Sequence, residues 1–305
     1  MTTTQGRNGN SHIDQTVEWI TPERAADILN HHNSHNRPIS RNNVNFLSNE
    51  MRSGRWMVNG DAISFDTNGN LVEGQHRCTS CVETGIPFET VVIYGLPPEV
   101  FPTLGRGKLR NISDNLALDG EKNSTLLGAA VTLVRNFENG WLQDSVNAKL
   151  LSGEHREILA RHPELRDIVN RSHKRHPRLR NVAITVGNYV AHLVDAGMAE
   201  EFMTGLDTGA DLPKGSPILL LRNRLTGGPL SGTSTAQGIA RFAYVAKALN
   251  AFYAGAKIQL LRWSKGDDIP AILGFNYGEP IDPARATQFS EPPRAAQKVV
   301  NTHLN

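Results

Sequence analysis

The chain has 305 residues, a length that predicts about two domains. It carries 32 lysine and arginine residues against 30 aspartate and glutamate residues, so its formal net charge is only +2. This balance excludes a global field strong enough to attract nucleic acid, and any such binding must come from a local patch. The hydrophobic fraction of 39% is enough for a core, and two cysteines exclude a disulfide scaffold.

The sequence shows no targeting or membrane-spanning segment. Residues 1–15 are polar and lack the apolar stretch of a signal peptide. The longest apolar run, residues 126–134, is shorter than the ~18 residues that a membrane span needs. We therefore expect a soluble cytoplasmic protein with no membrane partner.

Composition predicts two folded domains between flexible flanks. Residues 1–16 are rich in Thr, Asn, Gly and Ser and are expected to form a disordered arm. Residues 276–305, with scattered proline and charge, are expected to form a flexible tail. We assign residues 17–118 to a small mixed α/β domain and residues 119–275 to a mostly α-helical domain. The predicted fold class is α+β.

The elements of the first domain follow from capping and periodicity. Thr21 followed by proline and glutamate predicts a helix start, and that helix should reach about residue 32. A second helix is expected after Ser40, with Gly54 as its stop. Strands are expected at residues 62–65, 71–72 and 88–96, the first two joined by an Asn-Gly turn, and a short helix should end at residue 85.

The rest of the chain reads as helical. Apolar residues recur at helical spacing after about residue 120. These helices are expected near residues 124–137, 153–160, 164–172, 182–193, 199–206, 216–225 and 236–263. One more helix is expected at the end of the first domain, near residues 98–104.

The segment from Glu73 to Arg77 is the strongest indication of function. It follows a strand and opens a helix, so Gly74 permits a tight turn and the helix amides favour an anion. Arg77 offers a charged fork suited to phosphate, Gln75 can contact a base or sugar, and His76 can move a proton. The alternative is an ordinary strand-turn-helix with a surface arginine.

The string Leu71-Val72-Glu73-Gly74-Gln75-His76-Arg77 resembles the Asp-Gly-Gln-His-Arg signature of ParB/sulfiredoxin-fold proteins. The preceding Asp-Ala-Ile-Ser-Phe segment and the later β-branched strand agree with ParB N-terminal-domain proteins of phages and mobile elements. The resemblance covers roughly residues 18–118 and implies a turn that binds nucleotide or phosphate. Glu73 stands where the family commonly has aspartate, and Gln75 stands where sulfiredoxins carry their catalytic cysteine. Neither a second arginine-rich box nor a helix-turn-helix follows, so sulfiredoxin activity and chromosome partition are not expected.

Two basic segments are further candidates for anion binding. Residues 105–110 place Arg106, Lys108 and Arg110 beside two glycines, a pattern that can cradle phosphate or simply form a solvated loop. Residues 171–180 contain no acidic residue and can contact a nucleic-acid backbone without reading sequence. The DNA-contacting side chains predicted in that segment are Lys174, Arg175, Arg178 and Arg180. A solvated helix end is the alternative there.

Cysteine and histidine clusters have simpler interpretations. Cys78 and Cys81 share a helix face without a partner pair, which indicates two buried thiols. His31, His32 and His35 lie at a helix end without a carboxylate cluster, so no metal-ligating residue is assigned.

The sequence therefore predicts a DNA-associated protein that binds a nucleotide or phosphate, compatible with NTP hydrolysis or DNA cleavage. In that interpretation His76 is the acid or base, and Glu73 orients water or holds a divalent metal ion. Gly74, Gln75 and Arg77 bind the phosphate of a nucleoside triphosphate, with Arg106, Lys108 and Arg110 as secondary ligands. Two alternatives stay open, a non-catalytic DNA-binding regulator and a transferase that modifies DNA or nucleotides. Whether the protein is an enzyme, and its oligomeric state, are left undecided.

Overall fold

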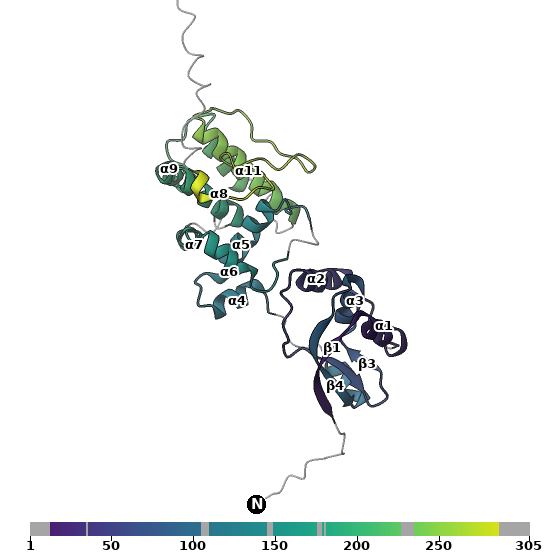
Figure 1. The fold of residues 1–305 in the computed structure, drawn as a ribbon. Helices are drawn as coiled ribbons and strands as arrows, with labels where there is room; N and C mark the ends of the chain where they lie inside the picture. Colours follow the sequence, from purple (N-terminus) through teal and green to yellow (C-terminus); the bar gives the residue numbers. More distant parts are fainter. Residues whose placement is uncertain are drawn as a thin grey trace, which may run out of the picture. The chain divides into compact units, whose positions relative to one another are not determined.

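The computed structural model describes residues 13–34, 36–104, 110–144, 149–175, 179, 181–226 and 235–286. The chain divides into two compact units (Figure 1). Unit 1 comprises Met1–Leu109 and Leu151–Gly153, and unit 2 comprises Arg110–Leu150 and Glu154–Asn305. The architecture combines a small mixed sheet with many helices, which confirms the α+β class.

Unit 1 contains a four-stranded sheet in the order β1-β4-β2-β3. The strands are β1 (Asp14–Ile20), β2 (Ile63–Asp66), β3 (Leu71–Glu73) and β4 (Phe88–Leu96). The β2–β3 and β1–β4 pairs are antiparallel, whereas β2 and β4 are parallel. The three later strands confirm the sequence prediction.

Strand β1 corrects the prediction of a disordered arm for residues 14–16. It starts at Asp14 and pairs with β4 along its whole length, from Asp14 opposite Tyr94 to Ile20 opposite Phe88. Its first residues are polar and exposed, so composition alone gave no apolar alternation to identify it.

Three helices pack on this sheet, namely α1 (Pro22–His31), α2 (Arg41–Arg52) and α3 (Gln75–Thr84). Thr21 caps α1 as expected, with its side chain accepting a hydrogen bond from the Arg24 amide. Helix α3 lies between α1 and α2. The core of the unit lies between the helices and the sheet. It includes the buried side chains of Ile20, Ile28, Ile63, Phe65, Leu71, Phe88 and Val92.

A short 3-10 helix, η1 (Pro98–Thr103), follows β4 in unit 1. The helices of unit 2 come after it in the chain. They are α4 (Ile112–Leu118), α5 (Ser124–Glu138), α6 (Glu154–Arg161), α7 (Leu165–His173), α8 (Val182–Val194), α9 (Ala196–Thr208), α10 (Pro217–Thr226), α11 (Thr235–Tyr253) and α12 (Pro283–Ala286). Helix α8 is central, since it contacts α5, α7, α9, α11 and α12. None of the helices in the described part of the chain is both long and apolar enough to cross a bilayer.

Two boundaries differ from the prediction. The division between the units falls at residues 109–110 instead of 118, because Leu116 of α4 is buried in the core of unit 2. Helix α11 ends at Tyr253, well before the expected residue 263, where the chain reaches Gly255 with a φ of 63°.

The predicted flexible tail is wrong for its described part, residues 276–286. Ile281 and Ala286 are buried, and the Ile281 amide donates a 2.9 Å hydrogen bond to Glu138 Oε1. His162 Nε2 lies 3.1 Å from the same oxygen, and its Nδ1 lies 2.8 Å from the Tyr189 hydroxyl. Burial alone would raise the pKa of Glu138, but the His162 contact and the charge of Arg161 outweigh it and lower that pKa. This buried polar chain fixes the C-terminal segment against α5 and α8.

Candidate functional site

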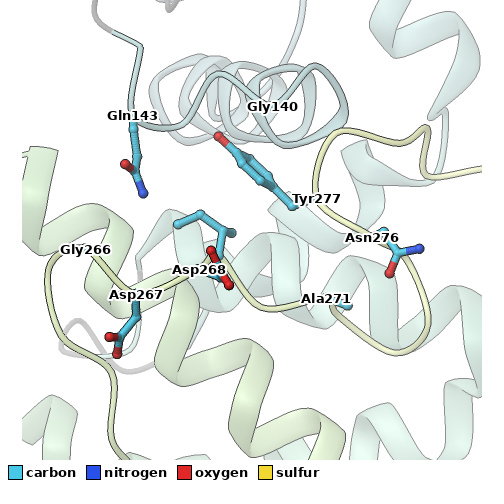
Figure 2. A pocket seen from close by; sticks show the side chains of 9 residues that line it. Gly140, Gln143, Gly266, Asp267, Asp268, Ala271, Asn276 and Tyr277 are labelled. Atoms are coloured by element: carbon cyan, nitrogen blue, oxygen red, sulfur yellow. The ribbon is translucent and has the colours of Figure 1, made fainter.

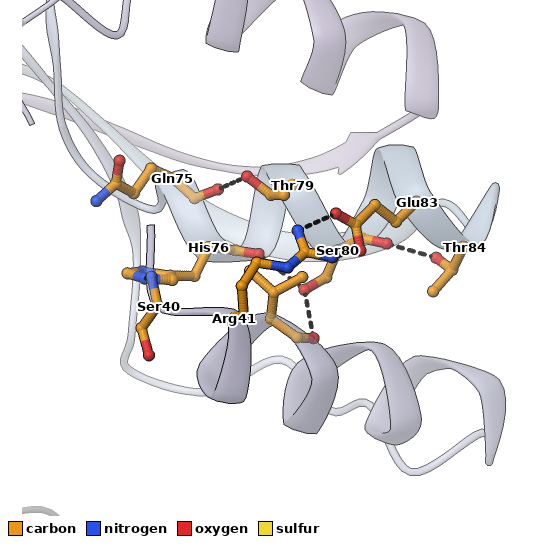
Figure 3. A network of polar contacts seen from close by, with 9 residues as sticks. Ser40, Arg41, Gln75, His76, Thr79, Ser80, Glu83 and Thr84 are labelled. Atoms are coloured by element: carbon orange, nitrogen blue, oxygen red, sulfur yellow. Dashed lines mark hydrogen bonds and ion pairs between the residues drawn. The ribbon is translucent and has the colours of Figure 1, made fainter. Parts of the chain in front are cut away.

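Helices α2 and α3 lie side by side and run in the same direction (Figure 3). The Ser40 amide donates a 3.0 Å hydrogen bond to His76 Nε2 at their N-terminal ends. One turn further, Ser80 Oγ donates to the Val44 carbonyl at 3.1 Å. The two helices therefore start at the same corner of unit 1, which we call the α2–α3 corner and define by residues 37–43 and 73–77.

Two helix N-termini and the exposed Arg37 favour an anion at this corner, and the Glu73 carboxylate opposes it. Each helix N-terminus carries about half a positive charge from its aligned peptide dipoles. Ser40 is the N-cap of α2 and Gly74 is the N-cap of α3, and neither makes a side-chain capping hydrogen bond. The dipoles of two parallel neighbouring helices repel each other, because like partial charges meet at each end. An anion at the shared N-terminal end would therefore be stabilised by both helices.

The connection between α1 and α2 covers the turn between β3 and α3. Its described residues are 32–34 and 36–40. The Leu71 amide donates to the His32 carbonyl at 2.7 Å, and Asn36 Nδ2 donates to the Leu71 carbonyl at 2.6 Å. Gln75 Nε2 donates to the Arg37 carbonyl at 2.8 Å. The connection thus occupies the outer edge of β3 and is tied to the first residues of α3.

Gly74 has a structural reason to be glycine. Its φ is 114°, in the region that residues with a side chain rarely adopt. A Cβ at this position would lie 2.8 Å from Cγ1 of Ile63 in β2. Close packing of the turn on the sheet therefore requires the glycine, whether or not a ligand approaches its backbone.

His76 is buried and its Nε2 accepts the Ser40 amide proton, so the imidazole is neutral with its proton on Nδ1. Burial and the nearby charge of Arg37 lower the pKa of His76 below its usual 6.5, against an opposing effect of Glu73. The side chain predicted as an acid or base is therefore an acceptor that positions α2.

Arg77 and Glu73 are also engaged within unit 1. Arg77 Nη1 donates to the Ala62 carbonyl at 2.8 Å, and Nη2 lies 3.4 Å from Asp61 Oδ2. Only 14% of the Arg77 side chain is exposed. Glu73 Oε1 accepts a 3.3 Å hydrogen bond from the Gly74 amide. The structure thus brings the five residues of the signature together, with their polar groups directed at the protein's own backbone.

The exposed groups of the corner were not predicted as ligands. They are Arg37, the N-cap residue Ser40 and the first residues of α2, from Arg41 to Asn43. Arg41 is paired with Glu83 of α3 at 2.6 Å, whereas the Arg37 side chain is exposed beside the two helix ends. The serine that starts α2 was visible in the sequence, but its placement beside α3 depends on a contact between residues far apart in the chain.

The other predicted anion ligands are dispersed. Arg110 is exposed at the start of unit 2, whereas Arg106 and Lys108 lie outside the described residues. Lys174 is exposed after α7, and Arg178 and Arg180 lie outside the described residues. Arg175 forms ion pairs with Asp207 and, at 3.6 Å, with Glu200, so its guanidinium is already bound to acidic side chains of α9.

The two cysteines are free and buried in the core of unit 1, which confirms the prediction. Burial raises the pKa of Cys78 to about 12 and that of Cys81 to about 11. Both thiols are therefore protonated and unreactive at neutral pH. Within the ranges that the structure describes, no group of three or more His, Cys, Asp or Glu side chains could hold a metal ion.

Unit 2 contains an open depression of about 540 Å³ (Figure 2). Its lining includes Gln143, Asp267, Asp268, Asn276 and Tyr277. Several of these groups serve the local backbone, since the Tyr277 hydroxyl accepts the Leu142 amide at 2.9 Å and Asp267 accepts the Ser264 amide at 2.8 Å. The depression gives no indication of a specific ligand.

Comparisons with protein-family models, curated proteins and solved structures found no match to this chain. The resemblance to the ParB/sulfiredoxin fold therefore depends on the signature residues and on the elements around them.

Replacing Gly74 with alanine should lower the free energy of unfolding of unit 1 by about 2–4 kcal/mol, because it combines a strained φ with overpacking on Ile63. Gly85→Ala is the matched control, since Gly85 has a φ of 69° but open space around its Cβ position. That control should cost only about 1 kcal/mol. Hydrogen exchange of α3 amides in increasing urea measures both, and equal losses would contradict the steric account.

The neutral His76 should make unit 1 less stable as the pH falls below 6.5, since the unfolded imidazole then takes up a proton that the folded one resists. His76→Gln keeps an acceptor for the Ser40 amide without titrating, so its stability should vary less between pH 7 and 5. His192 of unit 2 also has a lowered pKa, mainly through burial, and His192→Gln is the control. Exchange rates of α3 amides across this pH range distinguish His76→Gln from the wild type and from the His192→Gln control. Identical profiles for wild type and His76→Gln would refute the assignment of His76 as a buried neutral acceptor.

Proposed function

We propose that unit 1 is a ParB/sulfiredoxin-like domain that binds the phosphate of a nucleotide at the α2–α3 corner without acting on it chemically. The observation that carries this proposal is the parallel start of α2 and α3 beside an exposed arginine, Arg37. The signature string from Leu71 to Arg77 supports the same family assignment.

The electrostatics of the corner favour a phosphate over other ligands. Two helix N-termini and the charge of Arg37 act on the same small region, and charge-assisted hydrogen bonds from amides and guanidinium groups suit a tetrahedral oxyanion. Arg41 and Asn42 are exposed in the first turn of α2, where helix amides lack intrahelical partners, whereas the amides of Ser40 and Asn43 already donate to His76 Nε2 and the Ser40 carbonyl. In contrast, Gln75 and His76 are buried beneath the α1–α2 connection.

The same geometry favours binding over catalysis. A general base needs a free acceptor and a reacting group within hydrogen-bond reach, but His76 Nε2 is occupied by the Ser40 amide. Glu73 accepts a backbone proton, and Arg77 is held by Ala62 and Asp61. NTP hydrolysis, DNA cleavage and transfer to DNA or nucleotides thus receive less support than recognition of a phosphate.

Association with DNA is the second part of the proposal, as a non-catalytic regulator. Arg171 and Lys174 are exposed at the end of α7, where two cations can meet a phosphate backbone. Arg175 is excluded from this surface by its ion pairs with α9.

Arg37→Ala should weaken nucleoside triphosphate binding about 10- to 100-fold, the effect of one charged hydrogen bond of roughly 1.5–3 kcal/mol. Arg52→Ala is the matched control, because Arg52 is also exposed but lies at the C-terminal end of α2. Arg77→Ala is unsuitable, since loss of the buried guanidinium would destabilise the fold itself.

Calorimetric titration with each ribonucleoside triphosphate and with inorganic phosphate measures these affinities. No binding to the wild-type chain, or equal weakening by both variants, would overturn the proposed site.

The double variant Arg171→Ala/Lys174→Ala should bind duplex DNA more weakly and with a shallower salt dependence, by about one unit of slope for each lost phosphate contact. Lys214→Ala/Lys265→Ala removes the same charge from other exposed positions of unit 2 and should bind like the wild type. Fluorescence anisotropy at several salt concentrations measures the slopes. A wild-type chain that does not bind DNA would refute DNA association. Two double variants that behave alike would refute the assigned surface.

A further inference from the structure

Strand β1 is the edge strand at one end of the sheet. The strand pairs with β4 on one side, and among the described residues no strand pairs with its other side. The opposite end of the sheet is different, because the α1–α2 connection bonds to Leu71 of β3 through the His32 carbonyl and Asn36. One edge is therefore covered, whereas residues 15–20 of β1 have no second strand beside them in the described part of the chain.

Apart from the carboxylates of Asp14 and Glu18, this edge has few of the features that usually prevent pairing. Its residues include no lysine or proline, and its register with β4 runs without a bulge from Asp14 to Ile20. Val17 and Trp19, which share one face of the strand, are 58% and 65% exposed. A regular edge strand with exposed apolar side chains is a template for strand addition.

The sequence of β1 is complementary to itself in one antiparallel register. With Val17 opposite Val17 of a second copy, Thr16 faces Glu18 and Gln15 faces Trp19 on each side of the two-fold axis. Moving the axis to Thr16 places Asp14 opposite Glu18, and moving it to Glu18 places two Glu18 carboxylates opposite each other. Like charges directly opposite are destabilising, so of these three registers only the one centred on Val17 has no opposed carboxylates.

We propose that a second copy of this chain adds to the free edge of β1, antiparallel and centred on Val17, to form a continuous sheet across a two-fold axis. The pairing would satisfy the backbone groups of both edges and bury Val17 and Trp19 of both copies. A self-complementary strand is what such an isologous interface requires.

Sedimentation equilibrium of the full chain tests this proposal. The wild type should approach the mass of a dimer as concentration rises, whereas Val17→Lys, which sets two lysines opposite each other, should remain at the monomer mass. Val82→Lys is the matched control, because Val82 is an exposed valine of α3, and it should dimerise like the wild type. Circular dichroism confirms that each variant is folded.

A charge pair at position 16 tests the register. Thr16→Glu faces the partner's Glu18 twice and should weaken dimerisation about 10-fold, whereas Thr16→Lys faces the same carboxylate and should dimerise at least as tightly as the wild type. A wild-type chain that stays monomeric, or a dimer that Val17→Lys leaves intact, would overturn the proposal. Equal effects of the two Thr16 variants would overturn the register.

Discussion

The hydrogen bond from the Ser40 amide to His76 Nε2 holds the N-terminal ends of α2 and α3 together, and the arrangement of the candidate site depends on this alignment. It joins the first residue of one helix to the first turn of another, so α2 and α3 begin at the same place and run parallel. The contacts further along the pair, such as Ser80 with Val44, then follow from that alignment. The bond also requires a neutral imidazole, which agrees with the lowered pKa of His76.

This arrangement separates the residues that build the corner from those that can bind at it. Gly74 packs on Ile63, Gln75 holds the α1–α2 connection, and Arg77 holds the loop before β2. All three are accounted for by contacts within the unit. The groups that are exposed at the corner are other residues, namely Arg37 and the start of α2. In the proposed function, the groups that bind the phosphate therefore lie outside the short motif that suggested the site.

Local sequence signals identified most elements of the fold. The cap at Thr21, the stop at Gly85 and the β-branched run of β4 each specify an element through nearby residues, and each was predicted. Strand β1 was missed because its polar, exposed residues become a strand only through pairing with β4. Residues 276–286 were misjudged for a similar reason, since the Ile281 amide is bound by Glu138, a residue far away in the sequence.

The candidate site shows the same limit. The sequence identified residues 73–77 correctly as a turn between a strand and a helix, and physical reasoning assigned Arg77 to phosphate. The sequence did not show that the Arg77 guanidinium would donate a hydrogen bond to the Ala62 carbonyl, or that residues 37–43 would lie beside the same helix end. Both depend on tertiary packing, which no periodicity or spacing encodes locally.

The central claim, that the α2–α3 corner binds a phosphate group, is tested most directly by hydrogen exchange of the wild-type chain with and without saturating nucleoside triphosphate. Our account predicts slower exchange of the backbone amides of Arg41 and Asn42, in the exposed first turn of α2, with smaller changes in the rest of unit 1. Unchanged exchange at these amides, or protection confined to another part of the chain, would contradict it.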